Sequence, residues 1–546
     1  MGVYLNSQAA YTLYRNETTK TYFVDKTRIL EELFPLVESG NHYVCITRPR
    51  RFGKTVMANL IASFFTKGVD ASGVFDRLSI SANSDYRKHI NQYNVIHISF
   101  NEMPKNCKTY EQYIDRIESR LIRDLEQAWP DVKIREGEAV WDILTDINGM
   151  DSSRRFIFVL DEWDYIFHRS FVTQEGQAAY IEFLSNLLKD KPYVTLAYMT
   201  GILPIAKYSS GSALNMFLEY TMATREKYSE YFGFHDREVD ELYERYLAVT
   251  ARPKVGREGL KQWYDGYHTL SGVKMYNPRS VVSALGDNQL GSYWTSSGPY
   301  DEISYYIEKN VDDVRDDLAR MAAGEAVRAR IQEYAATSMN LRTRDEIFSA
   351  MVVYGFLSCE DGNVSIPNRE LMDKFTEVLL KEPSLGYVYR LARESEKMLR
   401  ATLAGDTDRM LEILEFAHNT EIPLLSYSNE ADLTALVSLI YLSARDYYRV
   451  EREDKAGTGY VDFIFYPEKK DETGIILELK VNAPPREAIR QIKEKKYALR
   501  FEGRLGERAE YTGRILGVGI SYDKETKVHA CEIEVLRDQG VKRTEF

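Results

Sequence analysis

The sequence predicts an α/β protein in three parts: a parallel-sheet domain at residues 1–232, a mainly helical connecting region at 233–400, and a second α/β domain at 401–546. Near residue 50 a basic turn joins an apolar strand to a helix. Near residue 160 a fully apolar strand ends in two acids, and short strands return after residue 459. Strands that are apolar throughout are typical of parallel sheets covered by helices on both faces. A chain of 546 residues is also too long for one hydrophobic core.

The basic turn, RPRRFGKT, runs from Arg48 to Thr55 and precedes a helix with apolar residues at helical spacing. Its Gly-Lys-Thr end matches a phosphate loop, although Arg48 stands where the first glycine of that motif belongs. In such a loop, N–H groups and the lysine contact phosphates, the hydroxyl binds Mg²⁺, and arginines add phosphate attraction. Taken alone, the motif also fits a basic turn before a helix. The residues predicted to bind nucleotide here are Arg50, Arg51, Phe52, Gly53, Lys54, Thr55 and Val56.

The acidic pair is Asp161 and Glu162, directly after the apolar strand 156–160. Ligands of parallel sheets gather at the carboxyl ends of the strands. We therefore expect Asp161 to hold Mg²⁺ through water and Glu162 to polarise the water that attacks the nucleotide. An acidic loop after any buried strand is the alternative for this pair alone.

Apolar strands are also expected at 95–100 and 194–199, which favours one parallel sheet. Thr200 follows the last of them, where it could sense the γ-phosphate or simply cap a helix. Tyr22 and Phe23 either pack on a nucleotide base or belong to the core. In the helical middle region, Asp361-Gly362 predicts a hairpin turn within 357–366.

Near the C-terminal end, strands are expected at 460–466 and 475–481. The first carries Asp462, and the second carries Glu478 and Lys480, which share a face because side chains alternate along a strand. Two carboxylates can hold Mg²⁺, and a nearby ammonium can orient water for attack on a phosphodiester. Taken alone, this loose spacing also fits a salt-bridged structural lysine.

The formal net charge of −12 argues against a surface built for general DNA binding, so any nucleic-acid site must be local. The most basic segment is 486–500, where six basic side chains accompany two acidic ones. A solvated helix face is the alternative interpretation. The residues predicted to contact nucleic acid are Arg490, Gln491, Lys493 and Lys496.

The sequence favours a cytoplasmic protein without a membrane partner. No apolar run approaches the ~20 residues of a membrane helix. The first residues lack the basic and apolar regions of a secretory signal. Its four cysteines lie far apart without paired spacing, which excludes a zinc knuckle and makes a disulfide framework unexpected.

Together these residues resemble bacterial AAA-ATPase-like proteins that carry a C-terminal PD-(D/E)XK nuclease domain. The resemblance is dense over about the first 300 residues and rests on a few positions in the last 120. Further matching pieces are YFVDKT at 22–27, DEWD at 161–164, TGIL at 200–203, YFGF at 231–234, WYDGY at 263–267 and YNP at 276–278. The segment 209–215 departs from the usual form.

The resemblance implies a P-loop NTPase fold followed by a restriction-endonuclease-like fold. In proteins of this family an arginine is usual at the place that Arg48 occupies here. The resemblance also implies ATP and Mg²⁺ as cofactors, with Mn²⁺ as a further metal for the nuclease site. It also points to Gln491 as a supporting residue and to Glu430 as a further acid, although Glu430 also fits helix capping. The implied partner is nucleic acid, DNA rather than RNA, and a homo-oligomer stays open.

The predicted function is ATP-controlled cleavage of nucleic acid by an ATPase coupled to a metal-dependent nuclease. The alternative is a nucleotide-dependent switch or scaffold whose C-terminal domain binds DNA or a protein without cutting. These two differ in whether Asp462, Glu478 and Lys480 lie within reach of one metal ion. The predicted catalytic residues are Glu162, Asp462, Glu478 and Lys480, and the predicted metal ligands are Thr55, Asp161, Asp462 and Glu478.

Overall fold

The computed structural model describes residues 2–135, 137–205, 213–222, 225–294, 301–307, 310–331, 341–419, 430–456, 459–502 and 511–538. The chain divides into two compact units. Unit 1 comprises Met1–Gly298 and Ala329–Glu370, and unit 2 comprises Pro299–Arg328 and Leu371–Phe546. The domain boundaries at 232 and 400 stay predictions.

Unit 1 is built on the strands β1 (His42–Thr47), β2 (Asn94–Ser99), β3 (Phe156–Asp161), β4 (Val194–Gly201) and β5 (Leu218–Tyr220). They form a parallel sheet in the order β2-β3-β4-β1-β5. Strand β4 thus lies between β1, which leads into the phosphate loop, and β3, which ends at the acidic pair. The predicted parallel sheet is confirmed, and its carboxyl edge brings both motifs together.

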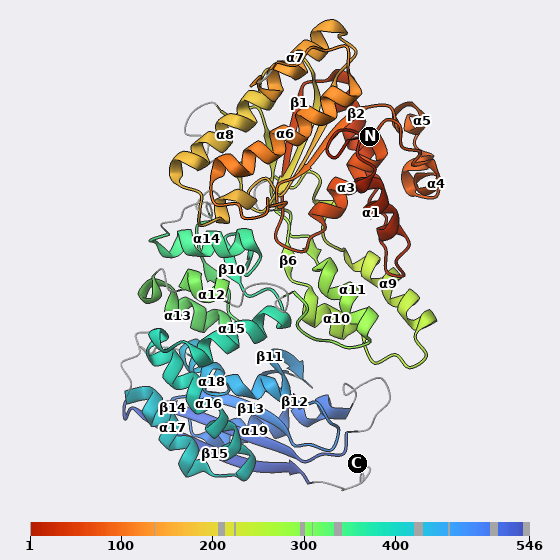
Figure 1. Ribbon diagram of the computed structural model, residues 1–546. Coiled ribbons are helices and arrows are strands. Elements are labelled where there is room, and N and C mark those ends of the chain that lie inside the picture. Colours follow the sequence, from red (N-terminus) through yellow and green to blue (C-terminus); the bar gives the residue numbers. More distant parts are fainter. Residues whose placement is uncertain are drawn as a thin grey trace. The chain divides into compact units, whose positions relative to one another are not determined.

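Helices cover both faces of this sheet (Figure 1). On one face lie α6 (Tyr110–Ala128), α7 (Val140–Met150) and α8 (Gln174–Leu188), and on the other α1 (Ala9–Thr18), α2 (Ile29–Ser39) and α3 (Lys54–Phe65). Strand β3 serves both layers, because Phe158 and Leu160 pack with the first set while Ile157 and Val159 pack with the second. All four side chains are fully buried.

A second, smaller core in unit 1 forms among α9 (Asp236–Val249), α10 (Arg257–Tyr264) and α11 (Pro278–Asp287). The turn after α10 requires glycine: Gly266 has a φ of 98°, and a Cβ there would lie 1.9 Å from the Pro367 carbonyl oxygen. The predicted hairpin is present as β9 (Ser358–Glu360) and β10 (Asn363–Ser365). Other elements of unit 1 are α4 (Ser72–Phe75), α5 (Tyr86–His89), β6 (Tyr267–His268), β7 (Lys274–Met275) and α14 (Arg344–Tyr354).

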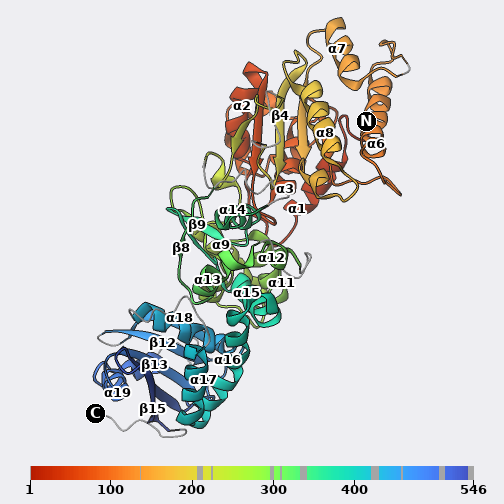
Figure 2. The same cartoon turned by 90° about the vertical axis from the view of Figure 1, so that its left-hand side faces the viewer.

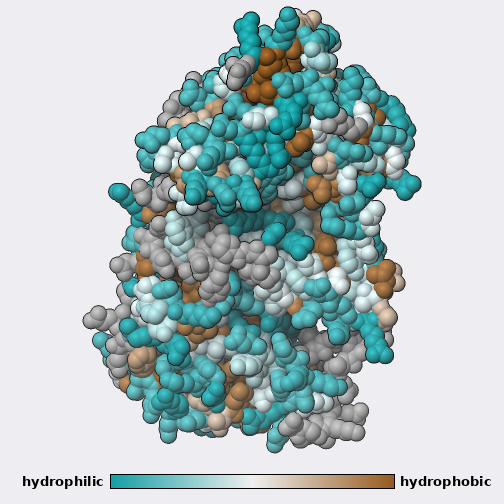
Figure 3. Space-filling model, in the orientation of Figure 1, coloured by the Kyte–Doolittle hydropathy of each residue, from teal (hydrophilic) through white to brown (hydrophobic). Residues whose placement is uncertain are grey.

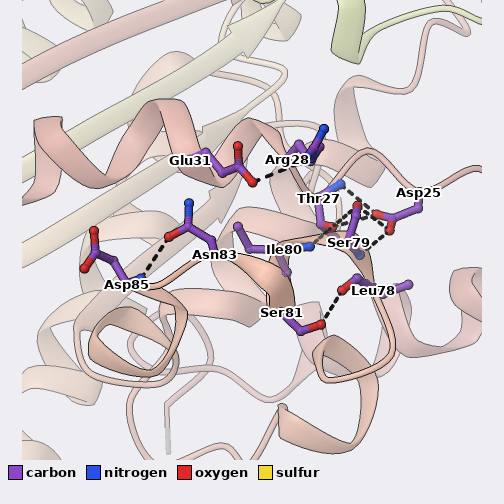
Figure 4. A network of polar contacts seen from close by, with 10 residues as sticks. All are labelled: Asp25, Thr27, Arg28, Glu31, Leu78, Ser79, Ile80, Ser81, Asn83 and Asp85. Atoms are coloured by element: carbon purple, nitrogen blue, oxygen red, sulfur yellow. Dashed lines mark hydrogen bonds and ion pairs between the residues drawn. The ribbon is translucent and has the colours of Figure 1, made fainter.

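Asp25 anchors the segment that precedes α2 (Figure 4). One carboxylate oxygen accepts hydrogen bonds from the Thr27 N–H and hydroxyl, at 2.9 and 2.7 Å. The other accepts from the N–H and hydroxyl of Ser79, at 2.6 and 2.7 Å. The segment is therefore fixed to the short 3-10 turn at Ser79–Ala82.

The anchored segment joins the two cores of unit 1. Phe23 packs with the cluster of α1 to α3, whereas Tyr22 packs with the cluster of α9 to α11. The Lys26 ammonium pairs with Glu238 of α9 and donates to the Glu230 carbonyl oxygen at 2.8 Å. Of the two roles considered for Tyr22 and Phe23, these contacts favour the core role.

An Asp25→Ala variant is expected to lower the stability of unit 1 by about 2–4 kcal/mol, because hydrogen bonds to a charged group contribute about 1.5–3 kcal/mol each and are not additive. The first thermal transition of the full chain measures this loss. Asp85, an exposed neighbour in Figure 4, supplies the matched control Asp85→Ala. An Asp25→Ala protein that melts like the control would show that the anchor contributes no stability.

Unit 2 holds a mixed sheet of β11 (Tyr448–Ala456), β12 (Gly459–Pro467), β13 (Gly474–Val481), β14 (Ile515–Asp523) and β15 (Val528–Arg537), in that order. Only the β13–β14 pair is parallel. The sheet lies between α17 (Thr407–Asn419) and α19 (Pro485–Glu494) (Figure 2). The remaining helices are α12 (Asp301–Ile307), α13 (Val311–Ala322), α16 (Tyr387–Ala404), α18 (Glu430–Ile440), and α15 (Arg369–Lys381), whose first residues belong to unit 1.

The surface drawn in Figure 3 is mainly hydrophilic, with apolar side chains in small separate groups. Scattered apolar residues of this kind are ordinary for a globular protein. Across the ranges that the structure describes, no helix combines the length and apolarity needed to cross a bilayer.

Candidate nucleotide and metal sites

The phosphate loop ends at a glycine that the backbone requires. Gly53 adopts the left-handed conformation, with a φ of 89°, immediately before α3. A Cβ at this position would meet nothing within 4 Å, so the loop is open on this side. Thr55 and Val56, in the first turn of α3, are exposed, as a residue that meets a ligand from solvent must be.

Lys54 is buried at the centre of the loop. Its ammonium donates to the carbonyl oxygens of Arg48 and Pro49, at 2.9 and 2.8 Å. Burial lowers its pKa to about 8, although the carboxylates of Asp164, Asp161 and Glu162 favour the charged form. The lysine therefore holds the loop closed and lies within electrostatic range of the acids after β3.

Asp161 is a buried carboxyl group that lacks a hydrogen-bond donor on either oxygen in the part of the chain described. Burial and the neighbouring Glu162 raise its pKa to about 7, while the Thr55 hydroxyl and the Lys54 ammonium act in the opposite direction. A cation at this point would satisfy both oxygens and favour the ionised form. The site thus fits a divalent metal ion between Thr55 and Asp161.

Glu162 has a φ of 53°, a left-handed conformation that is unusual for glutamate. Its side chain is partly exposed, unlike that of Asp161. Strained backbone of this kind clusters at functional sites. The next acid, Asp164, has a structural role: its carboxylate accepts from the N–H groups of Ile202 and Leu203, at 2.9 and 2.8 Å.

Arg48 does not provide the phosphate attraction that the sequence suggested. It is buried, and its guanidinium donates to the carbonyl oxygens of Thr47 and Tyr220, at 2.7 and 3.0 Å, and to the Ser229 hydroxyl at 3.0 Å. These contacts tie the start of the loop to β1, to β5 and to Ser229.

The Thr200 side chain contacts the strand that leads into the phosphate loop. Its buried hydroxyl donates to the Ile46 carbonyl oxygen at 2.8 Å. This contact links β4 to β1, so the geometry gives no support to the predicted role as a γ-phosphate sensor. The structure does not support the alternative role as a helix cap either, because Thr200 lies inside β4.

Arg50 and Arg51 of the loop lie near Arg279 of α11. The pKa of Arg51 is lowered by partial burial and by the positive charges of Arg279 and Arg50, while Glu162 raises it. Arg50 also lies over the Tyr354 ring, 5.8 Å from its centroid. Sequence reasoning missed Arg279, whose only signal was its place after Asn-Pro at the start of α11. Phe52 contributes by packing edge-on against Tyr267, with ring centroids 5.0 Å apart.

In unit 2 the two predicted acids meet where β12 and β13 separate. Their backbone ladder ends at Phe463 and Leu477. Beyond it, the Asp462 N–H donates to Glu478 Oε2 at 3.3 Å, and the Leu479 N–H donates to Asp462 Oδ2 at 2.7 Å. Side-chain contacts thus replace the ladder and bring both carboxylates together.

Lys480 joins this pair, with its Nζ 3.7 Å from Glu478 Oε1. Glu478 is buried and the lysine is partly exposed, at 20% of its side chain. Gln491 of α19 also donates to Glu478 through its Nε2. The structure therefore brings Asp462, Glu478 and Lys480 into one cluster, with Gln491 beside it.

Tyr497 links this cluster to β12 through its hydroxyl group. Its hydroxyl receives a hydrogen bond from Gln491 Nε2 at 3.3 Å and donates to the Tyr460 carbonyl oxygen at 2.6 Å. A continuous chain of contacts thus runs from β12 through α19 to Glu478. Gln491 therefore donates to the acid cluster, while its predicted contact with nucleic acid stays a prediction.

The other basic residues of α19 are partly compensated. Arg490 lies 3.8 Å from both Glu487 and Glu494, and Lys493 pairs with Glu534 of β15. Lys496, just beyond the helix, is exposed. These pairs weaken the positive face that the sequence predicted.

The Glu430 side chain lies outside the described part of the structure, as does most of the segment 209–215. Among the side chains that are described, no group of three or more His, Cys, Asp or Glu residues is placed to hold a metal ion. In the cluster beside Lys480, the described carboxylates are those of Asp462 and Glu478.

Two family models match the chain: "Predicted AAA-ATPase" over residues 12–210 and "PD-(D/E)XK nuclease superfamily" over residues 429–531. An uncharacterised protein from the vnfD 5′ region of Azotobacter chroococcum is 26% identical over 283 residues. The match spans 51% of this chain and 51% of that protein, so the chain covers about half the length of this curated relative.

Two solved structures are also similar. A Walker-type ATPase of Pyrococcus abyssi is 11% identical with a TM-score of 0.37, over 64% of this chain and 94% of that one. The ORC2 protein of Aeropyrum pernix, in its ADPNP–ADP complexes, is 12% identical with a TM-score of 0.31, over 64% of this chain and 91% of that one.

Proposed function

The chain joins an N-terminal AAA-ATPase-like domain to a C-terminal domain of the PD-(D/E)XK nuclease superfamily, and on this premise we propose that it hydrolyses ATP to control metal-dependent cleavage of nucleic acid. The observation that carries the proposal is the convergence of Asp462, Glu478 and Lys480, the three residues that the sequence predicted for the nuclease site.

In the ATPase site, the N–H groups at the start of α3 and the Lys54 ammonium bind the phosphates. Thr55 and Asp161 would hold Mg²⁺, which would supply positive charge beside the phosphates. Glu162 polarises the attacking water, because it is the partly exposed acid beside that metal position. Arg50, Arg51 and Arg279 add positive charge around the same phosphates.

In the nuclease site, Asp462 and Glu478 would hold Mg²⁺ or Mn²⁺, and that ion would supply an activated water and positive charge near the phosphate. Lys480 orients that water and stabilises the negative charge that develops on the phosphate oxygens. Gln491 fixes the Glu478 carboxylate by donating to Oε1, and Tyr497 fixes Gln491 in turn. The implied partner is nucleic acid, with DNA favoured over RNA only by the resemblance.

One observation favours the alternative of a nucleotide-dependent switch that binds without cutting. Both acids already accept hydrogen bonds from the protein, Asp462 from Leu479 and Glu478 from Asp462 and Gln491. A site satisfied in this way can persist without a metal ion.

A nuclease assay distinguishes the two. Purified full-length chain is incubated with single-stranded and double-stranded DNA and RNA, with Mg²⁺ or Mn²⁺, and with or without ATP. We expect metal-dependent cleavage that ATP changes in the wild type but not in a Lys54→Ala variant, which should lose nucleotide affinity. Binding without cleavage under every condition would favour the switch.

A further inference from the structure

Tyr460 is an exposed aromatic side chain beside the nuclease cluster that the proposed mechanism does not use. In the part of the chain that the structure describes, it is the most exposed large apolar side chain, at 67%. Aromatic rings in strands ordinarily bury most of their surface. Its neighbour Val461 is buried, so β12 alternates between an exposed and a buried side chain at this point.

The position of Tyr460 ties it to the metal-binding acids. It lies two residues before Asp462, and the pairing of β12 with β11 runs without a register shift over Tyr460 and Val461. Side chains two apart on a strand share a face and lie about 7 Å from each other. The ring of Tyr460 therefore projects on the same side as the Asp462 carboxylate, within reach of one nucleotide.

The backbone at Tyr460 is also held in place. Its carbonyl oxygen accepts a hydrogen bond from the hydroxyl of the buried Tyr497. The same hydroxyl accepts a hydrogen bond from Gln491 Nε2. Gln491 in turn donates to Glu478. A backbone fixed in this way loses little further freedom when a flat ligand stacks on the ring that it carries.

From this geometry we propose that Tyr460 is a stacking platform for an unpaired nucleobase next to the scissile phosphate, so that the nuclease site takes single-stranded or frayed nucleic acid. Bases within a duplex are stacked on one another and present no free face to the ring. Every unpaired base has such a face, so the platform would tolerate any sequence.

The charges nearby favour the same substrate class. Duplex binding relies on many phosphate contacts from Lys and Arg. On α19, three basic residues accompany two acidic ones, and Arg490 and Lys493 are already paired with glutamates. Stacking supplies affinity that these cations do not. This inference rests on the proposed function, because it assigns the substrate of the same site.

The test measures the affinity of full-length protein for a fluorescently labelled oligonucleotide, in an Asp462→Asn background that prevents cutting. Tyr460→Ala is expected to weaken binding of a single strand at least about fivefold, the lower range for losing one base–aromatic stack. Tyr460→Phe and Tyr460→Trp should retain affinity, and blunt duplex binding should be unchanged. Tyr447→Ala removes another exposed tyrosine of unit 2 and serves as the matched control.

A single abasic site moved along the oligonucleotide sharpens the test. At one position it should weaken binding to the protein with Tyr460 but not to the Tyr460→Ala protein. Equal affinity of both proteins for every strand, or an equal loss on strand and duplex, overturns the platform while leaving the nuclease proposal intact. Stacking without cleavage by the wild type would overturn the nuclease alone, and no binding of any nucleic acid would overturn both.

Discussion

An Asp462→Asn variant is expected to cut nucleic acid at least about 100-fold more slowly, because even outer-shell changes at metal sites cost 10–100-fold. Two ionised carboxylates side by side repel each other unless a cation relieves them. Mn²⁺ or Mg²⁺ should therefore raise the melting temperature of the wild type, and the variant should lose this rise. Asparagine keeps the oxygen that accepts from Leu479, so the fold should survive.

The controls separate the metal from the attacking water. Lys480→Ala should retain the metal-dependent rise in melting temperature yet lose cleavage, because its ammonium acts on the water and the phosphate and not on the ion. Glu468→Gln removes an exposed acid from the same domain and should change neither measurement. Normal cleavage by Asp462→Asn would exclude the two-carboxylate site and leave the binding switch as the better account.

The sequence predicted the fold well where pattern and burial coincide. Strand β3 is apolar from Phe156 to Leu160, and a strand of that kind must be covered on both faces, as Ile157 and Phe158 are. The hairpin at Asp361-Gly362 was likewise set by local chemistry, since both residues have positive φ values. Such features depend on neighbours in the chain, which a sequence displays directly.

The candidate sites were only partly predictable, because a residue type does not reveal its partners. An arginine in a phosphate loop reads as a phosphate ligand, but Arg48 is buried among carbonyl oxygens. The sequence predicts Gln491 as part of a basic helix face, whereas in the structure its side chain donates a hydrogen bond to Glu478. Arg279 comes near the loop only through the fold. Each of these outcomes depends on contacts between segments far apart in the chain.

Glu162→Gln is expected to bind ATP normally but to hydrolyse it at least about 100-fold more slowly, the lower range for losing a general base. Glutamine keeps the size of the side chain and can still hold a water, yet it cannot take up a proton. The melting temperature should not fall, and relief of the left-handed strain is not expected, since both residues prefer a negative φ.

The contrast with Asp164 makes this prediction specific. Asp164→Ala should lower the melting temperature of unit 1, because the N–H groups of Ile202 and Leu203 would lose their buried acceptor. The ATP turnover of Asp164→Ala should then fall in proportion to its fraction of folded protein. Glu162→Gln should lose turnover while its fraction of folded protein stays unchanged. Lys54→Ala should instead fail to bind nucleotide, which a titration with fluorescent ATP measures. If Glu162→Gln hydrolyses ATP at the wild-type rate, the activating group lies elsewhere and the strained backbone at position 162 needs another explanation.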